Sequence, residues 1–257
     1  MPINLNAAPR FAADLAALVE LPPAVVTAID AHAAAMSVDT EHRVDAPLEA
    51  MTVTPEGAAD LVRRLATENA TMASLPAARA EIIDLLARRI LREITVAGPA
   101  ILAGLKPLFE AAAESYTTAV AGLPADVRPE ALVRSGSAAV ALYEQAVAAR
   151  STLDKLAGLR NELADLGVRA AGNPQIEQRT RVLELADANA LAAVGFVQKD
   201  PTLGQWAGWL AVAGVRRLWW PTIDEQATLI AAIDATMPKR PAKKDPTIPM
   251  RGPKVAA

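Results

Sequence analysis

Residues 81–119 read EIIDLLARRILREITVAGPAILAGLKPLFEAAAESYTTA. Apolar side chains recur in this stretch at steps of three or four residues: Ile83, Leu86, Ile90, Ile94, Ala97, Ile101, Leu105, Leu108, Ala112, Tyr116 and Ala119. The average step is about 3.6 residues, the period of a straight α-helix with one buried face. The pattern therefore predicts a long helix over residues 76–120. Gly98-Pro99 and Pro107 interrupt it, and we expect a kink or a break there because an interior proline costs about 3 kcal/mol.

A second long segment, residues 128–166, has a seam of small and apolar residues at alternating steps of three and four. The seam consists of Ala139, Leu142, Ala146, Ala149, Leu153, Leu156 and Leu163, and Arg160 interrupts it. Only the short sequence GLPADVRP, residues 122–129, joins this segment to the first. Two long helices with so short a connection fold back on each other, so we expect an antiparallel hairpin.

Helix-start signals mark the remaining elements. A side-chain acceptor followed by proline, as in Asn173-Pro174 and Asp200-Pro201, is typical of a first helical turn. Thr222 with Glu225 forms a capping box. These signals predict helices over 55–72, 174–197, 201–219 and 223–236, with a shorter pair near 10–19 and 23–36. No alternating pattern is long enough to predict a sheet.

The expected fold class is therefore all-α: an elongated antiparallel helical hairpin or bundle with short N-terminal helices and an extended C-terminal tail. We expect four parts. Residues 1–53 form short helices and an acidic loop, and residues 54–197 form the long-helix hairpin bundle. Residues 198–237 form a tryptophan-rich helix pair packed on the bundle, and residues 238–257 form a basic, proline-rich tail.

The composition agrees with a helical protein and excludes cysteine chemistry. Alanine makes up nearly a quarter of the chain, whereas aromatic residues make up 4%. Alanine is the best helix former and a small core residue, which favours long, closely packed helices. Cysteine is absent, which excludes disulfides, a thiolate nucleophile and cysteine-ligated metals. Nineteen arginines against seven lysines suggest a GC-rich bacterial or bacteriophage genome.

We expect no transmembrane segment. The most apolar windows, residues 94–105 and 206–215, are about half the roughly 20 residues that a bilayer requires. The first residues, MPINLNAAPR, lack the basic and apolar regions of a signal peptide. The expected location is the cytoplasm or the inside of a virion or other particle.

No motif predicts a catalytic, cofactor-binding or metal site. His32 and His42, with Asp39, Glu41 and Asp45, offer imidazole and carboxylate ligands, but without the spacing of a hydrolytic zinc site. The ordinary interpretation is an acidic loop, and a helical enzyme with a site near residues 37–53 is the third of our functional alternatives. We interpret Glu177 with Arg181 as a surface pair at helical spacing.

All four tryptophans lie in one stretch, residues 205–222, with sequence QWAGWLAVAGVRRLWWPT. On a single helix, Trp206, Trp209 and Trp220 fall on one stripe with Arg216. Such a helix is either buried against the bundle or exposes tryptophan and arginine, the residues enriched at binding hot spots, to a partner. A membrane-interface helix is a further alternative. The candidate interaction residues here are Trp206, Trp209, Arg216, Trp219 and Trp220.

The tail beyond Met237 differs sharply in charge from the rest of the chain. Its candidate interaction residues are its six basic side chains: Lys239, Arg240, Lys243, Lys244, Arg251 and Lys254. With one acidic residue, the tail carries plus five, so the whole-chain charge of minus three leaves minus eight on residues 1–237. The tail either solubilises the protein, lies on the acidic surface of a neighbouring copy or partner, or contacts nucleic acid.

These features together favour a non-enzymatic structural or assembly protein without a cofactor. Its most plausible setting is a bacteriophage virion or its assembly, as a capsid-associated, head–tail connecting or scaffolding protein. The expected partners are other copies of this chain or other assembly proteins. The alternative is a nucleic-acid-associated helical protein that binds through residues 238–257.

Overall fold

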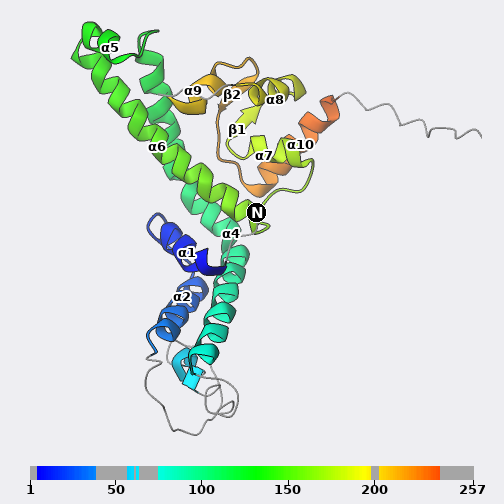
Figure 1. Cartoon of the computed structure of the whole chain (residues 1–257). Coiled ribbons are helices and arrows are strands. Elements are labelled where there is room, and N and C mark those ends of the chain that lie inside the picture. Colours follow the sequence, from blue (N-terminus) through cyan, green and yellow to red (C-terminus); the bar gives the residue numbers. More distant parts are fainter. Residues whose placement is uncertain (1–4, 39–56, 61, 64–74, 198–202, 238–257) are drawn as a thin grey trace, which may run out of the picture.

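The structure, a computed structural model, describes residues 5–38, 57–60, 62–63, 75–197 and 203–237. These residues are mostly helical, which confirms the all-α class. A long helical hairpin forms the axis of the molecule. Short N-terminal helices lie along one half of its longest helix, and a small C-terminal lobe lies beside the other half (Figure 1).

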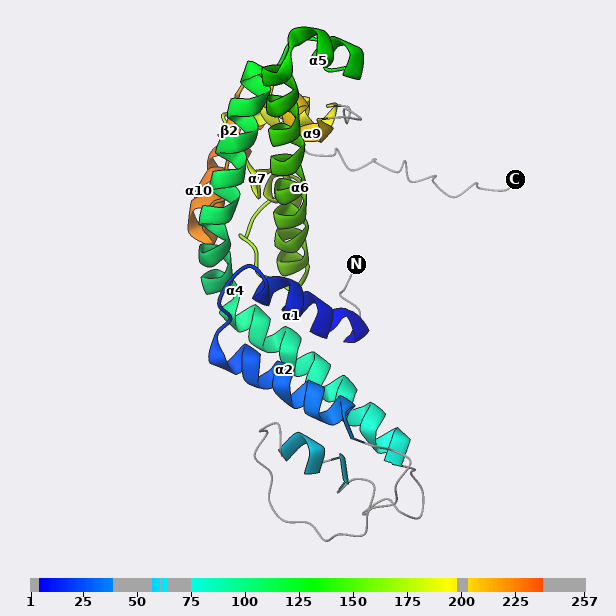
Figure 2. The ribbon, with the colours of Figure 1, turned by 90° about the vertical axis from the view of Figure 1, so that its left-hand side faces the viewer.

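Helix α4, Leu75–Gly122, is the long helix predicted from the apolar stripe. Its 48 residues span about 72 Å at about 1.5 Å per residue. Pro99 and Pro107 both lie inside it, and the helix changes direction near its middle (Figure 2). The interruption is therefore a bend in a continuous helix. Most of the stripe is buried as predicted, but Leu108 is 39% exposed.

The partner in the hairpin is α6, Ser137–Asp165, which is preceded by the short helix α5, Pro129–Ser135. The predicted single helix over 128–166 is split at Gly136, whose φ of 96° lies in the left-handed region that favours glycine. Helices α4 and α6 pack along each other, so the predicted antiparallel hairpin is confirmed (Figure 2). Leu153, Leu156 and Leu163 are buried between them and the lobe.

The N-terminal elements cover the half of α4 that α6 does not reach. They are a 3-10 turn, η1, at Leu5–Ala7, helix α1, Ala8–Ala16, and helix α2, Pro23–Met36. Leu15 and Val25 belong to the same buried cluster as Ile90 and Ile94 of α4. Of the helix predicted over 55–72, residues 57–60 and 62–63 are helical, and the rest lies outside the described residues.

The C-terminal lobe consists of residues 174–197 and 203–237. Its elements are α7 (Pro174–Thr180), β1 (Leu183–Leu185), α8 (Ala188–Gly195), α9 (Gly204–Leu210), β2 (Val215–Leu218) and α10 (Ile223–Thr236). The predicted start of α7 is confirmed, because the Asn173 side chain accepts a hydrogen bond from the Gln175 N–H. The capping box of Thr222 and Glu225 at the start of α10 is also confirmed.

Two predicted helices, 174–197 and 201–219, are wrong in part. The first is interrupted at residues 181–187, which include β1, and resumes as α8, whereas the second ends at Leu210. The chain instead forms an antiparallel pair of short strands, with Leu183 opposite Leu218. Gly214 makes the turn before β2 with a φ of 89°, and its carbonyl accepts a hydrogen bond from the Ala186 N–H. The single tryptophan helix therefore does not exist, because α9 ends at Leu210.

Most of α4 meets the length and composition criteria for a membrane-spanning helix, although no transmembrane segment was expected. Pro76–Gly122 is long and apolar enough, by length and composition alone, to cross a bilayer, and 33% of its most apolar window is buried. The core helix of a soluble protein passes the same test. The helix is weak evidence for a membrane location, and the expectation remains a prediction.

Candidate functional site

The lobe junction, where the C-terminal lobe meets α4 and α6, contains three of the four tryptophans in a buried cluster. Trp206 and Trp209 are edge to face, with ring centroids 5.2 Å apart. Phe109 of α4 contacts Trp206 at 6.3 Å and Trp220 at 5.0 Å between ring centroids. Aromatic pairs at these distances add about 0.5–1.5 kcal/mol each beyond their burial. The cluster fills the space that the alanine-rich helices leave open.

Three hydrogen bonds anchor the lobe to the hairpin. The indole N–H of Trp220 donates to the Leu102 carbonyl at 2.9 Å, and that of Trp206 donates to the Asp154 carboxylate at 2.7 Å. In the opposite direction, the Tyr116 hydroxyl donates to the Leu203 carbonyl at 2.7 Å. Buried indole and phenol groups need such partners. The tryptophans therefore fix the lobe at specific positions on both long helices.

Arg160, which interrupted the predicted seam, is a buried cation at this junction. It is 3% exposed, and its guanidinium lies 4.7 Å from the centre of the Trp220 ring. It donates to the Pro221 carbonyl at 2.9 Å and to the Gln226 side chain at 3.3 Å, while its Nη1 atom has no partner. Burial lowers the pKa of Arg160 to about 10, and the nearby charge of Arg181 acts in the same direction.

Glu177 and Arg181 are not the surface pair that the sequence predicted. Their side chains are 4% and 9% exposed, and Arg181 bonds both carboxylate oxygens of Glu177, at 2.7 and 2.8 Å. Gln226 of α10 donates to the Glu177 carbonyl at 2.8 Å, which connects this pair to Arg160. The prediction was wrong because α10, about forty-five residues further along the chain, covers the pair.

The candidate interaction residues on the tryptophan segment differ in accessibility. Trp206, Trp209 and Trp220 are buried, whereas Trp219 is half-buried. Arg216 is exposed and lies 3.2 Å from Glu184, which also pairs with Arg217 at 2.7 Å. The two hydrogen bonds lower the pKa of Glu184 despite partial burial, which by itself raises it. Trp219 and Arg216 are therefore the residues of this set that a partner can reach.

The candidate residues of the tail lie outside the described residues, as do most of residues 37–53 and His42. His32 lies on α2, where partial burial lowers its pKa. Among the residues that the structure describes, no group of three or more histidine and acidic side chains is placed to hold a metal ion. The metal alternative of His32, His42, Asp39, Glu41 and Asp45 remains untested for this reason.

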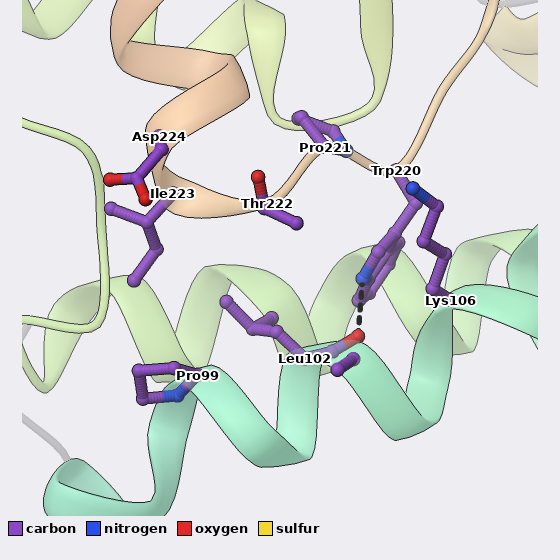
Figure 3. A pocket seen from close by; sticks show the side chains of 9 residues that line it. Pro99, Leu102, Lys106, Trp220, Pro221, Thr222, Ile223 and Asp224 are labelled. Carbon is purple, nitrogen blue, oxygen red and sulfur yellow. Dashed lines mark hydrogen bonds between the residues drawn. The ribbon is translucent and has the colours of Figure 1, made fainter.

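Two depressions lie along α4 beside the lobe. The first, about 270 Å³, lies between α4 and the start of α10, with Lys106 at one end and Asp224 at the other (Figure 3). Its floor includes Leu102 and the ring of Trp220. The second, about 520 Å³, is open and is lined by Arg216 and Trp219, among others. Both are shallow surfaces beside the lobe junction.

The outer face of α4 is a third candidate surface, directed away from the helices that pack on it. It consists of Leu85, Val96, Ala100, Ala103, Pro107 and Ala111, all of them exposed. Val96 is 73% exposed and Leu85 52%. The exposed Arg88 and Arg92 separate Leu85 from the other five, which lie between Val96 and Ala111. Exposed apolar surface of this kind marks protein or membrane contacts. This face was not predicted from the sequence, where only the buried stripe of α4 has a regular apolar spacing.

Comparison of the chain with protein-family models, with curated proteins and with solved structures finds no match. The structure has a lobe that tryptophans anchor to a long hairpin. It leaves the outer face of α4 uncovered.

Proposed function

We propose that this chain is a non-enzymatic structural or assembly protein that associates with further copies of itself through the outer face of α4. The observation that carries the proposal is the exposure of that face over about 39 Å of helix, from Leu85 to Ala111. Arg88, Arg89, Arg92 and Glu93 lie near its first end, but Lys106 is the only charged residue between Glu93 and Glu110, so the part from Val96 onward has few charges to keep it in water.

The charges at the two ends of the face favour an antiparallel pair of copies. Arg92 and Glu110 each lie nine residues from Ile101, and Arg88 and Glu114 each lie thirteen residues from it. A two-fold axis near Ile101 would place each arginine opposite a glutamate of the second copy. Symmetric pairs of this kind are the commonest form of protein self-association. A parallel arrangement would bring like charges together.

The setting that we propose is a bacteriophage virion or its assembly, in the cytoplasm or within the particle. The support is compositional. The helical body is rich in alanine and arginine and has a net negative charge, and a basic tail of twenty residues follows it. A tail with a charge of plus five complements a body with a charge of minus eight, so it fits the surface of a neighbouring copy. The membrane and nucleic-acid alternatives are outcomes of the tests below.

Size-exclusion chromatography with light scattering, at several concentrations, tests the association. Val96→Glu should shift the protein to monomer because it places a charge in the middle of the contact. Val133→Glu is the matched control, since Val133 is 72% exposed on α5, outside the face. Arg92→Glu should also weaken association, and the double variant Arg92→Glu/Glu110→Arg should restore it.

Three results would contradict the proposal. They are a monomeric wild-type protein, equal effects of Val96→Glu and Val133→Glu, and binding of the wild type to phospholipid vesicles that Val96→Glu abolishes. The last result would indicate that the face contacts a membrane.

Deleting residues 238–257 separates the roles of the tail. If the tail contacts a neighbouring copy, the deletion and added salt should both weaken association. If it contacts duplex DNA, up to six phosphate contacts give a log–log salt slope of about −5 in filter binding. A monomer that retains nucleic acid through this tail would favour the nucleic-acid alternative over assembly.

A further inference from the structure

A separate cavity of about 220 Å³ lies between α6, α7 and α9. Trp206 and Trp209 line it, whereas Trp220 lines the depression in Figure 3. We name it the amide pocket. The residues that matter for its chemistry are Asn161, Gln178, Arg179, Arg181, Gln205 and Trp209. Three are amides, two are arginines and one is an indole, so the pocket is rich in hydrogen-bond donors.

Arg179 supplies an uncompensated positive charge. It is half-buried, and among the residues that the structure describes no carboxylate pairs with it. The described lining of the pocket contains no acidic side chain. A guanidinium without a carboxylate partner keeps its full charge available to an anion from solvent.

Arg181 and Asn161 add donors whose positions are fixed. Three bonds hold the Arg181 guanidinium, two to Glu177 and one to the Asn161 side-chain oxygen at 2.7 Å. A guanidinium carries five N–H groups, so two remain beyond these three bonds, on a residue that lines the pocket. Because the Asn161 oxygen accepts from Arg181, its NH₂ group is left to donate.

Trp209 forms an apolar wall with one further donor. The residue is 6% exposed and packs edge to face on Trp206. The Trp206 indole N–H donates to Asp154, whereas no described residue accepts from the Trp209 indole N–H. The pocket thus combines hydrogen-bond donors and the small exposed part of the Trp209 ring with one positive charge that has no carboxylate partner among the described residues.

We propose that the amide pocket binds a carboxylate attached to a planar apolar group. A guanidinium and a carboxylate match each other in geometry as well as charge, and the exposed part of the Trp209 ring offers an apolar contact for the attached group. The carboxylate can belong to a small aromatic acid or to the C-terminus of a peptide. The inference is independent of the association proposed above, since no residue of the outer face of α4 lines this pocket.

Titration of the full-length protein with defined probes, followed through the four indole N–H signals in ¹H–¹⁵N spectra, tests the proposal. The probes are benzoate, N-acetylphenylalanine, the peptide Gly-Gly-Phe, N-acetylphenylalaninamide and inorganic phosphate. The acids should bind with a dissociation constant of about 1 mM, as expected for ligands of this size. They should shift one indole signal, which the variant Trp209→Phe identifies by its disappearance.

Arg179→Gln should weaken binding of the acids about ten-fold or more, because it removes a charge-assisted hydrogen bond. Arg134→Gln is the control for loss of one positive charge, since Arg134 is exposed on α5. Far-ultraviolet circular dichroism should show the same helix content for both variants. Tighter binding of Gly-Gly-Phe than of benzoate would identify a peptide terminus, and the reverse order a small acid. Both orders support the proposal.

Four outcomes would overturn it. The first is no shift with 10 mM acid, well above the expected dissociation constant of about 1 mM. The second is equal binding of N-acetylphenylalanine and its amide, which would show that the carboxylate is not recognised. The third is tighter binding of phosphate than of any acid. The fourth is the same affinity in Arg179→Gln as in Arg134→Gln.

Discussion

Replacing Trp220 with alanine tests whether the C-terminal lobe is held to the hairpin by its tryptophans. The side chain is 1% exposed, lies 5.0 Å from Phe109 between ring centroids, and donates to the Leu102 carbonyl at 2.9 Å. It also provides the ring over which the buried guanidinium of Arg160 lies. Truncating a core tryptophan costs about 3–5 kcal/mol in unfolding free energy. Because the change also removes the ring beside Arg160, we expect a loss of about 4 kcal/mol or more.

Two further variants divide this loss into its parts. Trp220→Phe keeps a ring next to Phe109 but lacks the indole N–H, so it should cost about 1–2 kcal/mol. Trp219→Ala changes the adjacent, half-buried tryptophan and should cost less than about 1 kcal/mol. Urea unfolding followed by far-ultraviolet circular dichroism is the appropriate assay, since it does not depend on tryptophan emission. The slopes of the transitions must agree before the free energies are compared.

The order of the three losses in unfolding free energy tests whether Trp220 packs in the core of the lobe junction. Equal losses for Trp220→Ala and Trp219→Ala would refute the packing described for the lobe junction. Smaller oligomers of Trp220→Ala at unchanged unfolding free energy would show instead that this side chain contacts another subunit, as one alternative from the sequence holds. Unchanged oligomers with a large loss of stability would assign Trp220 to the core alone.

Three further predictions concern stability, each measured by urea unfolding. Leu156→Ala, in the buried seam of α6, should cost about 2–5 kcal/mol, and a loss below about 0.5 kcal/mol would contradict the hairpin. Gly98→Ala should cost about 1–3 kcal/mol, because the new Cβ would lie 2.4 Å from a Val168 methyl group; Gly158→Ala, with nothing within 4 Å, should instead be neutral or stabilising. Burial lowers the pKa of His32 in the folded protein below the unfolded-state value of 6.5. The contribution of the neutral imidazole to the unfolding free energy is therefore complete above pH 6.5, and it is lost as the pH falls through the folded-state pKa. His32→Gln should reduce the loss of stability between pH 7.5 and pH 5. An unchanged loss would contradict the assignment of this pH dependence to His32.

Local signals predicted the helices where one buried stripe or one cap decides the structure. The apolar stripe of α4 and the capping box of Thr222 and Glu225 depend on residues within a few turns of each other. The same information predicted a bend or break near Pro99 but not which of the two. That choice depends on packing on both sides of the proline, where α1 and α2 cover one half of α4 and α6 covers the other.

The strands were missed because they are three and four residues long and pair across more than thirty residues of chain. Alternation cannot be recognised over so few residues. Apolar residues around Gly214 continue the helical pattern of α9 in the sequence, yet α9 ends at Leu210 and Gly214, with its positive φ, makes the turn into β2. Helical spacing therefore placed Trp206 and Trp220 on one helix, whereas in the structure they meet through Phe109 of α4.

The buried ionic groups show most clearly why the site could not be predicted. Glu177 and Arg181 have the same spacing as any exposed helix pair, and an exposed pair of this kind contributes about 0.3–0.5 kcal/mol. Gln226, which donates to the Glu177 carbonyl, and Asn161, which accepts from Arg181, come from two other helices. The pair is buried only because these helices meet there. Among the described residues, that meeting also leaves Arg179 beside Trp209 without a carboxylate partner. The charge of the amide pocket is therefore a property of the assembled lobe and has no signature in α7 alone.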